Sequence, residues 1–210
     1  MKKRVLTSIA ASAAVVASSA MLPAAPASAA TGQRSLATVL AKDGGGFDRK
    51  WRDFDILDNA VSAVLKSKPD SAVKVLADGS ERLTAFLPTD RAFRRLVTDL
   101  TGKRPSTERG AFTKLAAAAG VDTIETVLLY HVVPGATIRY AQARRSDGAA
   151  LTTATGQTLR VNVRKGGRIA LQDKDPNDAN AVILRSGKNI NKGNRQIGHA
   201  VSRVLRPANL

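Results

Sequence analysis

The sequence contains no cysteine, which removes three classes of structure at once. A disulfide framework, a lipid-modified N-terminal cysteine and a thiolate-bound zinc site all require that side chain. Histidine is also scarce, with two in 210 residues, so a histidine-based zinc site is not expected either. An ordinary hydrophobic core must therefore stabilise the protein, and we expect neither a metal nor a cofactor.

Acidic and aromatic residues are few as well. The chain has 33 lysines and arginines against 17 aspartates and glutamates, which gives a net charge of +16, and 4% of its residues are aromatic. A charge of this size attracts polyanions in general. Because few aromatic rings are available to stack on bases, nucleic acid is not expected as a specific partner. Acidic polysaccharides, wall polymers and anionic membrane surfaces fit better.

The chain divides into three parts. Residues 1–29 have the layout of a secretory signal peptide, with a basic start, an uncharged stretch rich in alanine and valine, and small residues at the end. A membrane anchor is the alternative, which Pro23 and Pro26 weaken. Residues 30–53, rich in glycine and charge, are expected to be a flexible N-terminal segment. Residues 54–210 are long enough for a single domain with its own core.

Apolar residues at helical spacing predict helices in the first part of the domain. We expect an amphipathic helix from about residue 54, a short second helix over 70–77, and a third helix after Thr89. The third helix has an apolar stripe formed by Phe93, Leu96, Val97 and Leu100.

Two further helices are expected before the character of the sequence changes. Residues 107–119 predict a helix that Gly120 stops. Asp122 and Glu125 have the spacing of a capping box, which opens a helix running into Tyr130.

One strand is expected within the helical part, and several more towards the end of the chain. Residues 82–87 form an apolar run typical of a buried strand, and "TLRVNVRKGGRIALQ" alternates apolar and polar residues around a Gly-Gly turn, which predicts a hairpin. Further strands are expected near 150–154, 181–185 and 198–205. The last of them contains His199 in an alternating pattern, so only one of its faces is expected to be buried. Helices followed by strands, without regular alternation, indicate an α+β domain with a mostly antiparallel sheet.

Three stretches in order resemble the motifs of fasciclin-like domains. They are "LTAFLPTDRAF" (83–93), "LLYHVVPG" (128–135) and "IGHAVSRVLRP" (197–207). The resemblance covers about residues 50–207. It implies a fasciclin-like fold, a twisted antiparallel β-wedge with a layer of α-helices, in a secreted or surface-anchored protein. It also implies adhesion or matrix binding, and no enzymatic activity. The short, alanine-rich export signal indicates a bacterial source.

Tyr130 and His131 stand at the end of an apolar run, just before a Pro-Gly turn. We interpret the tyrosine as a packed ring whose hydroxyl ties down a neighbouring loop, and the histidine as a partner for backbone groups near that turn. A general base needs a nucleophile or a metal beside it, and the motif supplies neither. The alternative is an exported hydrolase that uses His131 or His199, although the sequence has no Gly-x-Ser-x-Gly elbow.

The stretch "DKDPNDAN" (173–180) resembles the first positions of a calcium loop. Asp173, Asp175 and Asn177 match the first three ligand positions, but Asp178 replaces the glycine of the sixth and Leu184 the glutamate of the twelfth. An Asn- and Asp-rich turn is the better interpretation.

Basic residues gather in two stretches without acids, 149–172 and 179–210. If these stretches share a face, they form a positive surface for an anionic polymer; scattered solvated charges are the alternative. We therefore expect a secreted binding or adhesion module at a cell surface, wall or matrix, with peripheral membrane contact at most and an undetermined oligomeric state. A small-ligand carrier is a third possibility. The expected partner-binding residues are Tyr130, His131, Arg160, Arg164, Lys165, Arg168, Arg185, Lys188, Lys192 and Arg195.

Overall fold

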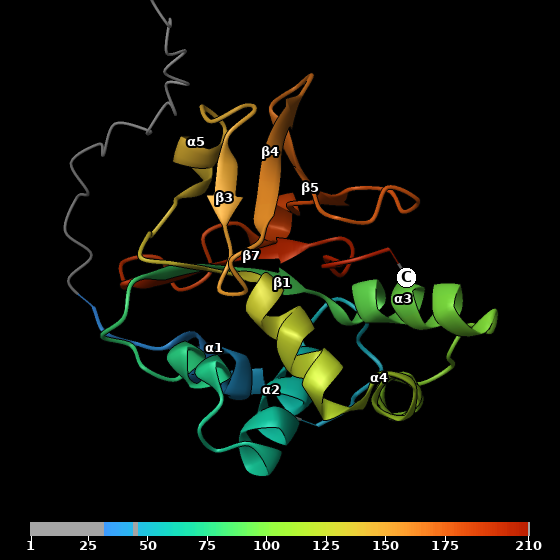
Figure 1. The fold of residues 1–210 in the computed structure, drawn as a ribbon. Coiled ribbons are helices and arrows are strands. Elements are labelled where there is room, and N and C mark those ends of the chain that lie inside the picture. The colour runs from blue at the N-terminus through green and yellow to red at the C-terminus, as the bar shows by residue number, and fades with distance from the viewer. Residues whose placement is uncertain (1–31, 44–45, 210) are drawn as a thin grey trace, which may run out of the picture.

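The computed structural model describes residues 32–43 and 46–209, so the signal segment expected at 1–29 lies outside the described residues. Figure 1 shows a four-stranded sheet at one end of the molecule, helices α2, α3 and α4 at the other, and the strand pair β1 and β7 between them. The helical elements are α1 (Leu36–Leu40), η1 (Ala41–Asp43), α2 (Asp55–Ser67), η2 (Ala72–Leu76), α3 (Asp90–Thr101), α4 (Glu108–Tyr130), α5 (Tyr140–Ala143) and η3 (Arg185–Gly187).

The strands form two sheets. The strands are β1 (Leu83–Pro88), β2 (Val132–Pro134), β3 (Ala150–Thr152), β4 (Thr158–Arg164), β5 (Arg168–Gln172), β6 (Ala181–Val182) and β7 (Gln196–Val201). One sheet has the order β2-β1-β7 and the other β3-β4-β5-β6. Every pairing is antiparallel except that of β1 with β7, which is parallel. The expected α+β class with mostly antiparallel pairing is therefore confirmed.

Strand β1 separates the hydrophobic core into two clusters. Leu83, Ala85 and Leu87 face a cluster built from α1, α2, α3 and α4, whereas Phe86 faces a cluster built from the four-stranded sheet. This division follows from the two-residue period of a strand, which sends alternate side chains to opposite faces. Both faces of β1 are buried, as its unbroken apolar run predicts.

Strand β7 is also buried on both faces, which corrects the expectation that His199 lies in a strand with one buried face. His199 is buried and bonded inside the protein, and so is Gln196, the first residue of the strand. The side-chain Oε1 of Gln196 accepts a hydrogen bond from Leu36 N at 2.7 Å, and its Nε2 donates to Val75 O and Asp78 O at 2.7 and 2.6 Å. The polar side chains of this strand therefore bind backbone groups inside the protein, and they do not indicate exposure to solvent.

Part of the segment expected to be flexible is packed in the core. Ser35 caps α1 by accepting a hydrogen bond from Thr38 N at 3.2 Å, and Leu36 and Leu40 are 0% and 4% exposed. These contacts differ from the expectation of a flexible segment over residues 30–53. Composition suggested a linker because the region is rich in glycine and charge, whereas two leucines at helical spacing bury its first half.

Helix α4 is two helices joined at Gly120, whose φ of 69° and ψ of 168° break the helical backbone. The expected stop at this residue is confirmed, and the second helix does run into Tyr130. Asp122 and Glu125, expected to form a capping box, instead both bind Lys68, with Asp122 Oδ1 at 2.7 Å from Nζ. Among the described residues no helix is both long and apolar enough to cross a membrane.

Candidate functional site

Tyr130 is the last residue of α4, and its side chain is fully buried. The hydroxyl donates a hydrogen bond to Thr158 O, 3.3 Å away at the start of β4. Burial is the main cause that raises the pKa of this hydroxyl to about 12, so it stays protonated and acts as a donor. Tyr130 therefore fastens the helical layer to the four-stranded sheet, and its side chain offers no surface to a partner.

His131 follows directly and is 4% exposed. Its Nε2 accepts a hydrogen bond from Leu205 N at 2.8 Å, which leaves Nδ1 to donate to Val127 O at 2.7 Å. Burial lowers the pKa of this ring to about 4, so the neutral form is the folded form at neutral pH. The ring joins the end of α4 to the C-terminal segment.

His199 is held in the same manner. Its Nδ1 accepts from Asn189 N at 3.3 Å, and its Nε2 donates to Ile138 O at 2.8 Å. Burial lowers the pKa of this ring as well. Both histidines thus use both ring nitrogens on backbone groups, and neither has a free nitrogen with which to take a proton from a substrate.

Several of the expected basic residues meet at the end of the β4–β5 hairpin. Arg164 pairs with Arg168 across the hairpin, and Lys165 follows in the turn between them. Arg185 comes two residues after Ile183, whose N–H donates to Ile169 O at 3.0 Å, so it lies beside the same end of the hairpin.

Lys188 also lies near the end of the β4–β5 hairpin, because it contacts Tyr140, which is bonded to the hairpin turn. The Lys188 ammonium lies 5.4 Å from the centre of the Tyr140 ring, and the Tyr140 hydroxyl donates to Gly167 O, in the hairpin turn, at 3.1 Å. The Arg144 guanidinium also lies against Gly167, where a Cβ would come within 2.3 Å of it. Figure 1 shows α5, which carries Tyr140, at the same end of the molecule as the hairpin.

We call this group the hairpin-end surface. It consists of the basic residues Arg144, Arg164, Lys165, Arg168, Arg185 and Lys188, all of them exposed. None of the ion pairs found within residues 32–43 and 46–209 involves any of the six. Sequence reasoning missed Arg144 and Tyr140, although the basic run "RYAQARR" (139–145) was a usable signal.

Three other expected residues lie elsewhere. Arg160 is four residues along β4 from Arg164, a separation of about 13 Å. Lys192 lies in the loop before β7, near the start of the described chain, because Gly32 N donates to Gly193 O at 3.0 Å. Arg195 is half-buried, and its guanidinium donates to Ser80 O at 2.9 Å. The two acid-free stretches therefore share a face only in part.

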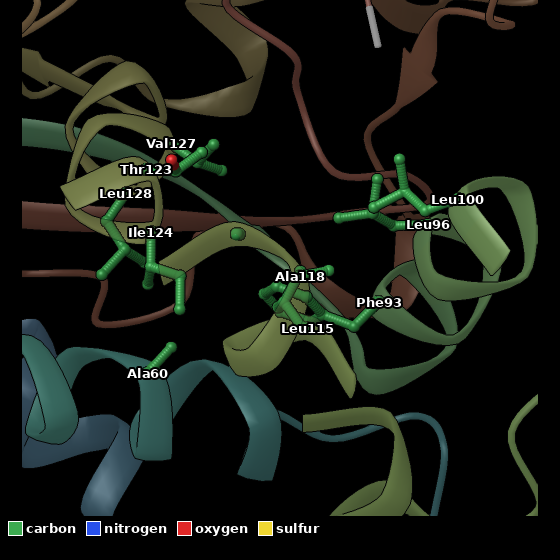
Figure 2. A pocket seen from close by; sticks show the side chains of 11 residues that line it. Ala60, Phe93, Leu96, Leu100, Leu115, Ala118, Thr123, Ile124, Val127 and Leu128 are labelled. Atoms are coloured by element: carbon green, nitrogen blue, oxygen red, sulfur yellow. The ribbon is translucent and has the colours of Figure 1, made fainter. Parts of the chain in front are cut away.

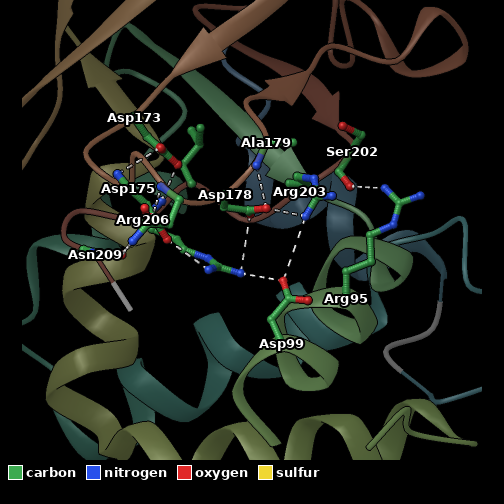
Figure 3. Close-up of polar contacts among 12 residues, drawn as sticks. Arg95, Asp99, Asp173, Asp175, Asp178, Ala179, Ser202, Arg203, Arg206 and Asn209 are labelled. Carbon is green, nitrogen blue, oxygen red and sulfur yellow. Dashed lines mark hydrogen bonds and ion pairs between the residues drawn. The ribbon is translucent and has the colours of Figure 1, made fainter. Parts of the chain in front are cut away.

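The C-terminal arginines are neutralised internally, as Figure 3 shows. Arg206 is 5% exposed and binds Asp175 at 3.0 Å and Asp99, on α3, at 2.8 Å. Arg203 binds Asp178 at 2.6 Å. These contacts use the carboxylates of the expected turn, whose Asp175 Oδ1 also accepts from Asn177 N at 2.9 Å. Residues 173–178 thus form a turn that neutralises arginines.

A second feature is an apolar groove between the helices, shown in Figure 2. It encloses about 320 Å³ and is lined by residues of α2, α3 and both halves of α4. Leu100, expected in the core, is 42% exposed and lines this groove. The last residue of the apolar stripe on α3 therefore faces this groove and is not enclosed in the core.

Comparisons with known proteins found a similar solved structure and a matching family. The solved structure of a FAS1 domain pair from the insect cell adhesion molecule Fasciclin I is similar at 17% identity and a TM-score of 0.49, over 73% of this chain and 48% of that chain. The chain thus spans about half the length of that structure. No curated protein matches the chain. The model of the Fasciclin domain matches residues 58–207, most of the sequence, and the chain belongs to the Fasciclin domain family.

Proposed function

We propose that the protein is a secreted adhesion module that binds an acidic polymer of a cell surface, wall or matrix through its hairpin-end surface. Fasciclin domains are adhesion-related modules, typically extracellular or at the cell surface. The expected signal segment at 1–29 supports export, and no described helix could span a membrane. The acidic polymer is the finer part of the proposal and rests on the surface itself.

The observation that carries the proposal is a group of six exposed cations that form no ion pair with a carboxylate in the part of the chain that the structure describes. The nearest acid along the chain, Asp147, is held by the hairpin, because its Oδ1 accepts from Val163 N at 2.7 Å. Like charges held close together repel, so a polyanion that bridges them relieves repulsion and adds attraction. Binding of this kind uses many weak contacts and weakens as salt screens them.

A salt series with two charge-matched variants tests the proposal. One variant removes four charges of the hairpin-end surface, as Lys165→Gln, Arg168→Gln, Arg185→Gln and Lys188→Gln. The control removes four exposed charges on the helical side, as Lys66→Gln, Lys74→Gln, Lys103→Gln and Lys114→Gln. Binding to a wall fraction and to defined acidic polysaccharides is measured at each salt concentration, and circular dichroism verifies that both variants are folded.

We expect saturable binding by the wild type that weakens with salt. The surface variant should bind at least about tenfold more weakly, since four contacts of about 0.5 kcal/mol each sum to about 2 kcal/mol, and a tenfold change in affinity corresponds to about 1.4 kcal/mol. The control should retain nearly all of the affinity. Equal losses in both variants would mean that net charge alone drives binding, and this outcome would contradict a defined site.

The groove supports a second candidate, the carriage of a small apolar ligand. Its volume of about 320 Å³ is within the range of small-molecule sites, and its walls are almost entirely apolar. Native mass spectrometry of the purified protein should then show a bound small molecule. Ala118→Trp, on the lining, should abolish that mass, whereas Ala117→Trp, next to it and outside the lining, should retain it. If the purified protein shows only its own mass at neutral pH, the hypothesis that it carries a small ligand is excluded.

A further inference from the structure

Five carboxylates gather on the helical side of the molecule, away from the hairpin-end surface. Asp48 and Asp53 lie in the loop before α2, and Asp55, Asp90 and Glu108 are the first residues of α2, α3 and α4. Backbone contacts hold the segments together: Asp90 N donates to Asp53 O at 3.0 Å, and Arg49 N donates to Glu108 Oε2 at 2.8 Å. Segments far apart in the sequence thus place their acids in one spot.

The oxygens of these residues lie close enough to share an ion. One carboxylate oxygen from each of Asp53, Asp90 and Glu108 lies within 4.8 Å of the other two, and the same is true of Asp48, Asp53 and Asp55. Asp53 belongs to both groups. Asp90, Glu108 and Asp55 are 0%, 1% and 3% exposed.

Part of this acidic group is satisfied by helix ends. Both oxygens of Asp90 accept backbone hydrogen bonds, from Ile56 N at 2.9 Å and from Asp55 N at 3.2 Å. The positive ends of three helix dipoles also converge here and favour negative charge. Backbone N–H groups thus bind both oxygens of Asp90 and one oxygen of Glu108.

Four of the remaining oxygens have no hydrogen-bond partner within the described chain. Glu108 Oε1, both carboxylate oxygens of Asp53 and Asp55 Oδ2 are buried without a hydrogen bond. None of the ion pairs found among the described residues involves Asp53, Asp55, Asp90 or Glu108. A buried charge without a partner is strongly unfavourable, so a compensating group is required.

We propose that Asp53, Asp90 and Glu108 bind a divalent cation of the hard type, calcium, with Asp55 beside it. Carboxylate oxygens without imidazole or thiolate select hard cations. Calcium has its oxygen ligands at about 2.3–2.6 Å, so two oxygens that share an ion lie at most about 5 Å apart, and the oxygens of these residues meet this condition. Water and backbone carbonyls complete such a shell. The site fastens the loop before α2 to the N-termini of α3 and α4.

A proton is the competing way to relieve the same cluster. Burial first, and then the neighbouring Asp53 carboxylate, raise the pKa of Asp90 to about 9. A shared proton and a cation make opposite predictions when calcium is added, because only the cation site responds to its concentration.

Trp51 provides a direct probe of the site. It is the single tryptophan of the chain, two residues before Asp53, and its carbonyl accepts from Arg91 N at 2.9 Å, next to Asp90. Terbium binds to calcium sites and emits when a nearby tryptophan is excited. The experiment titrates the chelator-treated full chain with terbium, displaces the terbium with calcium, and measures the melting temperature with and without calcium.

We expect tryptophan-sensitised terbium emission that calcium displaces, and a melting temperature that rises with calcium. Asp53→Asn and Glu108→Gln should each weaken binding at least about tenfold. Asp70→Asn, an exposed acid in a loop, makes the same charge change as Asp53→Asn and should leave binding unchanged.

Two outcomes would overturn the proposal. The first is wild-type protein without sensitised emission and with a melting temperature independent of calcium, which assigns a proton to the cluster. The second is binding that persists in Asp53→Asn, which places the ion elsewhere. If a variant fails to fold, the wild-type titration still decides. No acidic polymer is present in this experiment, so its result is independent of the hairpin-end surface.

Discussion

At the scale of single residues, the two histidines show how a chemically versatile side chain becomes a structural one. His131 joins Val127 to Leu205, and His199 joins Ile138 to Asn189. Each ring satisfies one backbone donor and one backbone acceptor in a buried place. An unsatisfied buried group of this kind costs about 1–3 kcal/mol, which is reason enough for a histidine at either position.

The pH dependence of the His131 contribution follows from the sign of its pKa shift. Burial lowers the pKa of His131 from 6.5 to about 4, so the unfolded chain binds more protons between these values. The contribution is therefore complete above pH 6.5 and is lost as the pH falls towards 4. A shift of this size corresponds to about 3 kcal/mol.

The test compares wild type with His131→Gln, which cannot titrate. The difference between their free energies of unfolding, measured in urea, should shrink by about 3 kcal/mol from pH 7 to pH 4. The difference is required because burial raises the pKa of Asp55 and of Asp90 in both proteins, which acts in the opposite direction. A difference that stays constant with pH would contradict the assigned role of the ring.

At the scale of elements, glycines and an internal ion cluster decide where segments end and how they are joined. Gly120 has φ 69° and ψ 168°, a conformation used almost only by glycine, and Gly102 ends α3 with φ 66° and ψ −2°, in the left-handed helical region. A Cβ at either place would have no neighbour within 4 Å. A side chain at either position would therefore destabilise the protein only through the strained backbone conformation, and not through steric contact.

We expect Gly120→Ala to lower the free energy of unfolding more than Gly102→Ala does. The left-handed helical region costs an alanine roughly 1 kcal/mol, whereas the conformation of Gly120 costs about 2–3 kcal/mol. Chemical denaturation of both variants measures the order directly. Equal losses would mean that α4 becomes continuous in the variant and that its break is not determined by Gly120.

Arg206 joins the loop after β5 to α3 and to the C-terminal segment. Its removal leaves Asp175, whose side chain is 0% exposed, without its cation. Arg206→Leu should therefore lower the free energy of unfolding by about 3–5 kcal/mol. Arg203→Leu, at a more exposed pair, should cost about 1 kcal/mol or less.

A double variant isolates the cause of that loss. Asp175→Asn removes the unpaired charge and keeps an acceptor for Asn177 N, so it should restore part of the stability of Arg206→Leu in denaturation experiments. Full additivity of the two substitutions would show that the ion pair itself contributes little.

At the scale of the whole molecule, the domain begins before the residues that match the family. The family match starts at residue 58, whereas α1 buries Leu36 and Leu40 and Gln196 binds the backbone of Leu36. The described chain from residue 32 therefore belongs to one folded unit.

Substitutions in α1 test this boundary. Leu36→Ala should lower the free energy of unfolding by about 2–5 kcal/mol, as expected for a fully buried leucine. Leu100→Ala, at a position 42% exposed, should cost much less. If Leu36→Ala does not change the unfolding midpoint, residues 32–43 do not contribute to the stability of the domain and are a flexible segment, as the sequence suggested.

Much of the fold was predictable because it depends on local patterns. Apolar periodicity indicated α2, α3 and both halves of α4, and alternation indicated the β4–β5 hairpin. The errors have one common origin, because the polar or apolar composition of a segment was used to infer whether it is exposed to solvent. Composition suggested a flexible lead-in where leucines are buried, a solvated side for β7 where His199 is buried, and a buried apolar stripe on α3 whose last residue, Leu100, is exposed.

Local sequence patterns were sufficient to predict the α+β class, the positions of most helices and strands, and the ordered motifs of the family, because each depends on residues near one another in the chain. The folded chain was needed to establish which cations share the hairpin-end surface, that both histidine rings are fully used, and that Asp53, Asp90 and Glu108 converge. These properties arise from contacts between segments as far apart as Leu36 and Gln196, 160 residues along the chain, and no local pattern encodes which distant segments meet.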